Sequence, residues 1–301
     1  MKLFLKKVGL EVKTDPALFE KSIFEYFEER GTVFNANLEV KDRKVLLSNS
    51  TTNNTMLNAP MGRSPHCPMA LFNKWSEQDQ QRSMDLLNSG SRKFKRVSIA
   101  VSVLLENSPT NHILLTRRGL HMRSFPGIWV LPGGGVESYD QDIFETARRE
   151  LLEETGIDTS RECWSILAMW ESVYPTFLHQ GPPKRHHLVI YLKAKLNLFS
   201  KLDSTAFDLL KPQEEEVDAI TWLNKQDLSK VLQKSDAKEL LPSNKENSFL
   251  AVELKNKQPI LMYLNQLQTI EAGAGDSVAL SQERLSLGTV FAMKQWITQS
   301  G

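Results

Sequence analysis

The sequence predicts an α+β protein, and three observations support this class. Apolar, β-branched runs of strand length recur along the chain, most clearly in Val97–Leu105 (VSIAVSVLL) and His187–Leu196 (HLVIYLKAKL). Segments with apolar residues at helical spacing accompany them, as in Leu287–Thr298 (LGTVFAMKQWIT). No apolar stretch approaches the roughly 18 residues of a membrane span. A soluble core built from both kinds of element is therefore expected.

Composition narrows the class of protein. The 301 residues could hold one large domain or two ordinary ones, and 41% apolar with 24% charged residues is ordinary for a globular protein. The net charge of +1 gives no strong field toward nucleic acid or membrane, so any polyanion binding must be local. Two cysteines, Cys67 and Cys163, fit a reducing compartment. We expect a cytoplasmic protein without membrane association, and no protein partner is implied.

The patterns within residues 1–90 predict a small, separate α/β unit. No motif in these residues indicates its role. Leu3–Val12 has the pattern of a strand, and Pro16–Arg30 has apolar residues close to helical spacing. Val33–Ser48 alternates around a charged turn and predicts a hairpin. Ser48–Asn58 is polar and predicts a loop or linker.

We expect residues 91–235 to form the main domain of the protein. Its first strand, Val97–Leu105, should pair with Ile113–Thr116, and Trp129–Leu131 leads into a run of glycines. Beyond a helix, further strands are expected in Trp164–Trp170, in His187–Leu196 and at the end of Glu214–Leu223.

Residues 236–301 predict an extension that packs on this domain. The chain past Leu228 is polar and Lys-rich, as in a linker. A hairpin is expected in Phe249–Leu264, and an amphipathic helix in Leu287–Thr298.

Three carboxylates cluster within Leu131–Ile157, which reads LPGGGVESYDQDIFETARRELLEETGI. Glu150, Glu153 and Glu154 stand at i, i+3 and i+4, so a helix places them within a sector of roughly 100°. Carboxylates packed so closely repel one another and raise each other's pKa. A hard divalent cation, which takes oxygen ligands, removes this repulsion. Arg149 lies four residues before Glu153 and can orient or partly neutralise the cluster.

This stretch resembles the Nudix box, the signature of hydrolases that cut nucleoside diphosphates linked to another group. The family pattern is Gly, five residues, Glu, seven residues, Arg-Glu, an aliphatic, any residue, Glu-Glu, any residue, Gly and an aliphatic. The matching positions are Gly135, Arg149, Glu150, Leu151, Glu153, Glu154, Gly156 and Ile157. Gln141 stands where the pattern has Glu, with Asp140 beside it, and the glycine loop is one residue longer than usual. In the family, the Glu at this position usually supports the glycine loop. Its replacement by Gln141 therefore bears on the geometry of that loop.

The resemblance implies an α-β-α sandwich with a mixed sheet between helices, and metal-assisted hydrolysis of a phosphoanhydride by a water of lowered pKa. The cofactor it implies is Mg²⁺ or Mn²⁺. The expected metal ligands are Glu150, Glu153, Glu154, the carbonyl of Gly134 or Gly135, and Glu216 in the segment EEEVDAITWL. The expected catalytic residues are Glu150 or Glu153 as acceptor of the water's proton, supported by Arg149.

Segments outside the box resemble a vertebrate branch of the family that acts on N7-methylguanosine-capped RNA and releases N7-methyl-GDP. They read WESVYP, KRHHLVIYL, EVDAITWL and GTVFAMKQW. The implied partner is thus a nucleotide or capped RNA. Candidate substrate-binding residues are Arg117, Lys184, Arg185, His187 and Tyr174. The four residues of KRHH, Lys184 to His187, could equally form a solvated turn, and an aromatic such as Tyr174 at a strand end is often part of the core.

Two alternatives remain open. The segment LLTRRGLHMRS, residues 114–124, partly resembles the one that precedes the box in coenzyme A diphosphatases, which favours coenzyme A or another small dinucleotide as substrate. The departure at Gln141 would also fit an inactive domain that senses nucleotides or mediates interactions, although the intact Glu cluster argues against it.

Overall fold

The computed structural model contains two packing units. It describes residues 1–8, 12–18, 21–49, 57–72, 74–88, 96–122, 125–160, 164–177, 183–202, 204–213, 215–237, 242–255, 258–264, 267–269 and 284–299. Unit 1 comprises Met1–Val101, Gly135–Thr146 and Ala168–Ile190, and unit 2 comprises Ser102–Gly134, Ala147–Leu167 and Tyr191–Gly301. These units reflect packing alone, so the expected domains 1–90, 91–235 and 236–301 stay a prediction.

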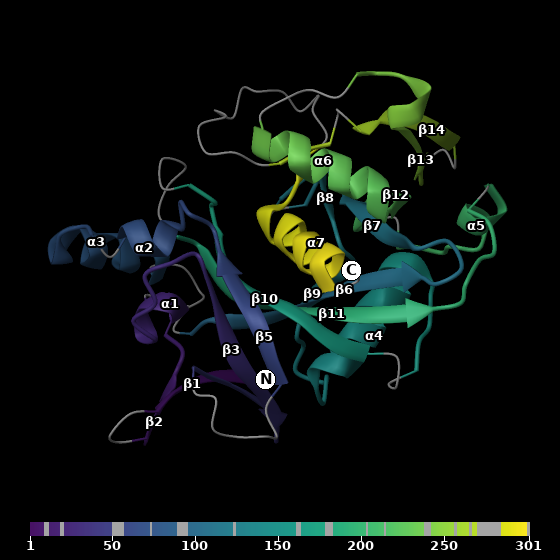
Figure 1. Ribbon diagram of the computed structural model, residues 1–301. Coiled ribbons are helices and arrows are strands. Elements are labelled where there is room, and N and C mark those ends of the chain that lie inside the picture. The colour runs from purple at the N-terminus through teal and green to yellow at the C-terminus, as the bar shows by residue number, and fades with distance from the viewer. Residues whose placement is uncertain are drawn as a thin grey trace. The chain divides into compact units, whose positions relative to one another are not determined.

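Unit 1 is built on a mixed sheet (Figure 1). Its strands include β1 (Lys2–Val8), β2 (Val12–Pro16), β3 (Val33–Lys41), β4 (Lys44–Ser48), β5 (Leu57–Arg63) and the later part of β10 (Trp164–Tyr174). They follow the order β10-β5-β3-β4-β1-β2. The pairs β1–β4 and β5–β10 are parallel, and the other pairs of this series are antiparallel. Helices α1 (Ile23–Tyr26), α2 (Pro68–Phe72) and α3 (Glu77–Asn88) complete the unit.

The predicted helix Pro16–Arg30 is wrong over most of its length. Among the described residues of this range, only the four of α1 are helical, and Pro16 belongs to β2. The carboxylate of Glu171, distant in sequence, accepts hydrogen bonds from the Ile23 amide at 2.6 Å and the Ser22 hydroxyl at 2.9 Å. Because these donors stand at the first turn, the helix begins there. It ends within two turns, where Glu28 takes a positive φ of 61°.

The two other N-terminal predictions have different outcomes. The single strand Leu3–Val12 is wrong, because β1 and β2 are separate antiparallel strands. The hairpin Val33–Ser48 is confirmed as β3 and β4, with Asp42 and Arg43 both at positive φ, as tight hairpin turns require. Most of the predicted loop 48–58 lies outside the described residues, and its last two residues belong to β5.

Unit 2 is also built on sheet strands that pair in both directions. Its strands are the later parts of β6 (Ser98–Asn107) and β11 (Arg185–Leu196), with β7 (His112–Arg118), β8 (Ile128–Val130), β9 (Gly133–Gly135), β12 (Val217–Asn224), β13 (Ser248–Glu253), β14 (Gln258–Tyr263), β15 (Gln268–Thr269) and β16 (Arg284–Leu285). The order β14-β13-β12-β7-β6 is antiparallel where register is defined. The parallel pair β8–β16 makes the sheet mixed. The predicted strands of the main domain and the predicted C-terminal hairpin are confirmed.

Helices cover both faces of the unit 2 sheet. The α-helices that follow β9 in the described residues are α4 (Ile143–Thr155), α5 (Ser204–Asp208), α6 (Lys225–Ala237) and α7 (Leu287–Gln299). The indole nitrogen of Trp296 in α7 donates to Glu106 at 2.8 Å, and Glu106 stands opposite Ile113. Thr116, three residues after Ile113, points to the other face and contacts Glu154 of α4 at 3.4 Å. The helices α7 and α4 therefore lie on opposite faces, as the expected sandwich requires.

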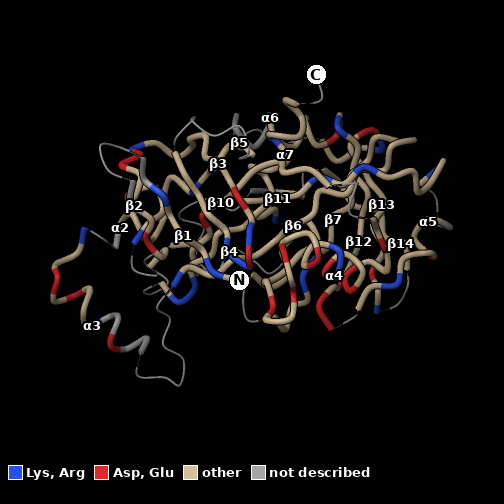
Figure 2. The backbone as a smooth tube through the Cα atoms, turned by 90° about the horizontal axis from the view of Figure 1, so that it is seen from below, with Lys and Arg blue, Asp and Glu red and all other residues tan. Residues whose placement is uncertain are grey.

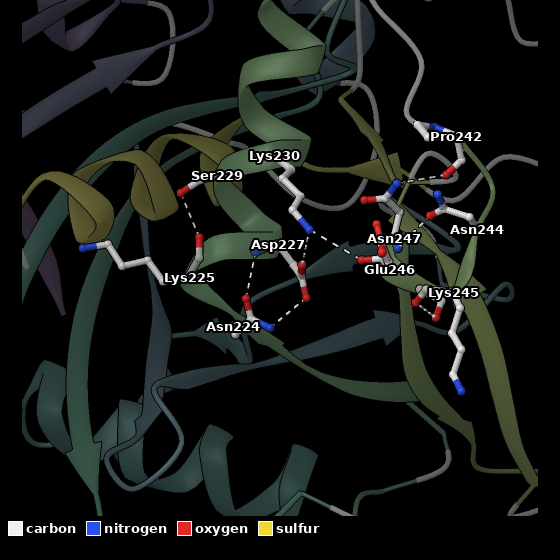
Figure 3. Close-up of polar contacts among 11 residues, drawn as sticks. Asn224, Lys225, Asp227, Ser229, Lys230, Pro242, Asn244, Lys245, Glu246 and Asn247 are labelled. Atoms are coloured by element: carbon white, nitrogen blue, oxygen red, sulfur yellow. Dashed lines mark hydrogen bonds and ion pairs between the residues drawn. The ribbon is translucent and has the colours of Figure 1, made fainter.

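The C-terminal helix is confirmed as α7, which lies beside α6 (Figure 1). The predicted linker past Leu228 is wrong at its start, because α6 continues to Ala237. Figure 3 shows what holds this helix: Asn224 accepts from the Asp227 amide at 2.8 Å and donates to the Asp227 carboxylate at 2.7 Å. Lys230 contacts the same carboxylate at 3.3 Å. Among the described helices, none is long and apolar enough to cross a membrane.

Replacing Asn224 with alanine is expected to lower the free energy of unfolding by about 1 kcal/mol, because the cap of α6 is lost. Urea titration measures this as a lower midpoint at an unchanged slope. Asn224→Ser is the matched control, since its hydroxyl can still accept from the Asp227 amide. Equal losses in both variants would show that the cap bond does not stabilise α6.

Candidate active site

The glycine loop and α4 set the positions of the clustered carboxylates. Strand β8 leads into β9, which consists of three glycines, and α4 begins eight residues later. The side chain of Asp142 accepts hydrogen bonds from the amides of Phe144 and Glu145, both at 2.9 Å, and so caps the helix. Gly156, at a φ of 75°, follows its last residue. Both ends of the helix are thus defined by the local sequence. Figure 2 marks acidic residues in red along α4.

Carboxylates of three residues converge beside α4. One oxygen from each of Glu150, Glu154 and Glu216 lies within 4.8 Å of the others. Glu150 is 7% exposed and Glu154 is 3% exposed. Glu216 is less buried and immediately precedes β12. Three oxygen donors at such separations suit a hard divalent cation such as Mg²⁺ or Mn²⁺, so the residues present fit the implied metal.

Arg149 and Glu153 flank this group. The Arg149 guanidinium donates through Nη1 to Glu150 at 2.7 Å and to Glu153 at 3.0 Å, so it orients two of the three box carboxylates. Glu153 lies outside the converging group of Glu150, Glu154 and Glu216. Its roles as metal ligand and proton acceptor stay a prediction.

The glycines approach the carboxylates closely. The Gly133 amide donates to Oε2 of Glu154 at 3.2 Å. A Cβ atom placed on Gly134 would lie 2.5 Å from both carboxylate oxygens of Glu150, a separation that real Cβ atoms do not show. Gly134 therefore has to be glycine for the carboxylate of Glu150 to lie where it does. Gly135 faces open space, and metal binding by the carbonyls of Gly134 or Gly135 stays a prediction.

Burial makes the carboxyl groups of Glu150 and Glu154 hard to ionise. It raises the pKa of Glu150 to about 7, although the nearby Arg149 guanidinium acts in the opposite direction and lowers this pKa. Burial also raises the pKa of Glu154 to about 8, with a further contribution from the charge of Glu150 and opposing ones from Arg118 and the Gly133 amide. A divalent cation would reverse this balance by stabilising the ionised forms.

The stability of the metal-free protein is therefore expected to fall as the pH rises. Both carboxyl groups have folded-state pKa values above the ordinary 4.5, so the folded state holds these protons more tightly than the unfolded state. Their stabilising contribution is complete below about pH 4.5 and is lost as the pH rises through 7 to 8. The loss should amount to several kcal/mol.

Thermal unfolding between pH 5.5 and 8.5 with a chelator measures this dependence. Saturating Mn²⁺ should flatten it, because a bound cation favours the ionised carboxylates. Glu154→Gln in chelator is the control, since it removes the larger of the two titrations and should also flatten the profile. A melting temperature of the wild type that stays constant or rises over this range would contradict the expectation.

Asp140 supports the glycine loop, a role that the family pattern gives to the Glu replaced here by Gln141. It is 1% exposed, and its Oδ2 accepts from the Glu137 amide at 2.8 Å and from the Thr146 hydroxyl at 3.0 Å. Gln141 stands at the position of the pattern's Glu. Its backbone amide donates a hydrogen bond to the carboxylate of Glu145. A buried carboxylate one residue earlier thus connects the loop to the first turns of α4.

Arg117 is already engaged within unit 2. Its guanidinium lies 3.3 Å from Glu253 and 5.8 Å from the centre of the Trp129 ring. Its predicted contact with substrate stays a prediction. The neighbouring Arg118, which the sequence did not single out, lowers the pKa of Glu154 and so lies near the carboxylate group.

The other predicted substrate residues belong to unit 1. The Lys184 amide donates to the Tyr174 carbonyl at 2.7 Å, and Lys184 itself is exposed. Burial lowers the pKa of His187 to about 4, with smaller contributions from His186 and Arg185, so His187 is neutral at pH 7. His186 is buried against Glu171 at 3.0 Å. The KRHH cluster is thus less cationic than its sequence suggests, and its substrate contacts stay a prediction.

Two residues that contact Glu154 could not be found by spacing. Thr116 and Gly133 lie 38 and 21 residues from Glu154 in sequence and reach it only through the packing of β7 and β9 on α4. The only sequence signal at Thr116 is a hydroxyl residue directly after the apolar residues Ile113, Leu114 and Leu115.

The fold and the site together define a hydrolase of the metal-dependent phosphoanhydride class, and comparisons with known proteins specify the family. The NUDIX domain model matches residues 96–243. The human m7GpppN-mRNA hydrolase NUDT17 is 31% identical over 270 residues, which cover 87% of this chain and 77% of that protein. The zebrafish (Danio rerio) protein of the same name is 32% identical over 252 residues, covering 79% of this chain and 76% of its own length.

A crystal structure of a MutT protein from Methanosarcina mazei is 25% identical and covers 46% of this chain and 81% of that one, with a TM-score of 0.34. The identity to the human relative extends over most of both chains. The chain therefore belongs to the Nudix hydrolase family, whose members cleave phosphoanhydride bonds of nucleotide-linked substrates with the help of divalent metal ions.

Proposed function

We propose that this protein hydrolyses the phosphoanhydride bridge of N7-methylguanosine-capped RNA and releases N7-methyl-GDP. The observation that carries the proposal is the converging group of Glu150, Glu154 and Glu216, the first two from a Nudix box, within a chain that matches m7GpppN-mRNA hydrolases over most of its length. The two cysteines of the sequence, of which Cys67 is a free, buried thiol, support the cytoplasm as its location.

In this proposal Glu150, Glu154 and Glu216 would hold Mg²⁺ or Mn²⁺, which would supply positive charge beside the phosphoryl oxygens and a water of lowered pKa. Glu150 or Glu153 accepts the proton of that water. Arg149 contacts both carboxylates and keeps them aligned. Water attacks phosphorus, the phosphoanhydride bond breaks, and the RNA leaves with a 5′-phosphate. Gly134, which has no Cβ atom, leaves the room that the carboxylate of Glu150 occupies beside the loop.

Product analysis tests the proposal. The full chain with Mg²⁺, and separately with Mn²⁺, is offered methyl-capped RNA, unmethylated-capped RNA, coenzyme A and ADP-ribose side by side. Release of N7-methyl-GDP is expected from the methyl-capped RNA, in preference to the other substrates, and it should be lost in Glu154→Gln. Cleavage of coenzyme A or ADP-ribose alone would reject the RNA substrate and keep the chemistry. Tight nucleotide binding without any cleavage would reject both.

A further inference from the structure

The side chain of Thr116 lies in the middle of β7, where the sheet is paired on both sides. Thr116 stands opposite Ile220 of β12 and opposite Val130 of β8, and it is 1% exposed. Its neighbours Leu114 and Leu115 are fully buried apolar residues. Valine has nearly the same shape as threonine and suits a buried strand at least as well, because it carries no hydroxyl that needs a partner. The hydroxyl at this position therefore calls for a reason.

The hydroxyl finds its partner in the carboxylate group. Thr116 Oγ1 donates to Oε2 of Glu154 at 3.4 Å, and within the described part of the chain it contacts no other acceptor. The Gly133 amide donates to the same oxygen at 3.2 Å. Two donors, one from a central strand and one from the glycine loop, thus converge on Oε2. No donor from the described residues reaches Oε1, which leaves that oxygen available to a cation.

We propose that Thr116 is a positioning residue of the metal site: its hydroxyl, with the Gly133 amide, holds Oε2 of Glu154 and leaves Oε1 as the oxygen that would bind the ion. The inference rests on the proposed function only in that Glu154 is a metal ligand, and it does not depend on which substrate is cleaved. Partners of this kind, which contact a ligand rather than the metal, restrict rotation of the ligand and typically change metal affinity 10- to 100-fold when removed.

The length of the contact sets the expected size of the effect. At 3.4 Å the hydroxyl is farther from the carboxylate than the usual 2.5–3.0 Å of a hydrogen bond between oxygens, so it contributes less than a short bond would. The Gly133 amide remains in place when the hydroxyl is removed. We therefore expect Thr116→Val to weaken Mn²⁺ binding by about 10-fold, at the lower end of that range.

Electron paramagnetic resonance of free Mn²⁺, titrated with the full chain in the absence of substrate, tests this. Thr116→Val should raise the dissociation constant about 10-fold, and Thr116→Ser, which keeps a hydroxyl, should restore it to within about threefold of the wild type. The matched control is Thr221→Val in β12, a buried threonine whose hydroxyl donates to the Leu250 carbonyl at 2.7 Å. It removes a hydroxyl from the same sheet and should leave Mn²⁺ affinity unchanged.

Unchanged Mn²⁺ affinity in Thr116→Val, or an equal loss in Thr221→Val, would overturn the proposal. So would failure of Thr116→Ser to recover the affinity of the wild type. If Thr116→Val does not fold, Thr116→Ala removes the same hydroxyl and is measured in its place. Loss of Mn²⁺ binding in Glu154→Gln verifies the premise, and its absence would overturn the inference. A wild type that binds Mn²⁺ as expected but leaves capped RNA intact would reject only the proposed substrate.

Discussion

Glu154→Gln is expected to reduce phosphoanhydride hydrolysis by about 1,000-fold while the protein remains folded. Glu154 is 3% exposed and shares with Glu150 and Glu216 the group that could hold the ion. Glutamine keeps the size of the side chain and can still accept from the Gly133 amide, but it has no negative charge to offer a cation. The loss should therefore fall on metal binding and turnover rather than on folding.

The same substitution is expected to make the metal-free protein more stable above pH 8. In the wild type the ionised carboxylate of Glu154 is buried beside Glu150, and this raises its pKa to about 8. A neutral amide removes that cost. Steady-state turnover and thermal unfolding in chelator at pH 8.5 measure the two effects, which have opposite signs. The control is Glu145→Gln, an exposed residue of the same helix, which should retain turnover. Full turnover of Glu154→Gln at ordinary Mg²⁺ would contradict the assignment.

Gly134→Ala is expected to reduce turnover by about 100-fold. The added Cβ atom would lie 2.5 Å from both oxygens of the Glu150 carboxylate, so the carboxylate or the loop must move. The carboxylate is the movable partner, yet its position is also held by Arg149 at 2.7 Å. A displacement of about 1 Å at a catalytic group can cost two orders of magnitude in rate. Mn²⁺ affinity should fall together with turnover.

Gly135→Ala provides the matched control for this prediction. A Cβ atom on Gly135 meets nothing within 4 Å, so turnover should stay within about threefold of the wild type. Both variants add one methyl group to neighbouring residues of the same loop. Equal losses of turnover would show that loop flexibility, rather than the contact with Glu150, determines the effect. Unchanged turnover in Gly134→Ala would contradict the geometry of the site.

Local sequence patterns predicted those strands and helices whose apolar pattern is clear within a single segment of the chain. The buried strands β6 and β11 follow from their β-branched, apolar runs, and α7 follows from its helical periodicity. The spacing of Glu150 and Glu154 placed both on one face of α4 because a helix turns by a fixed angle per residue. Glu216 was found through its resemblance to a recurrent family segment, and the structure places it beside both.

Contacts between distant segments account for what the sequence did not predict. Residues 16–30 have helical spacing, but the carboxylate of Glu171 binds the Ile23 amide, and the chain before it pairs as β2. The helix α6 is the exception, because its cap by Asn224 is local, and its polar, Lys-containing sequence was interpreted as a linker. Thr116 and Gly133 carry no spacing signal at all, since their relation to Glu154 exists only once β7, β9 and α4 have packed.

The most direct test of the account is a crystal structure of the full chain with Mn²⁺, read at the anomalous signal of the metal. We expect a peak within ligand distance of oxygens from Glu150, Glu154 and Glu216, with Oε2 of Glu154 still contacting the Gly133 amide and the Thr116 hydroxyl. A peak coordinated by Glu153 without Glu154, or one away from these glutamates, would contradict it.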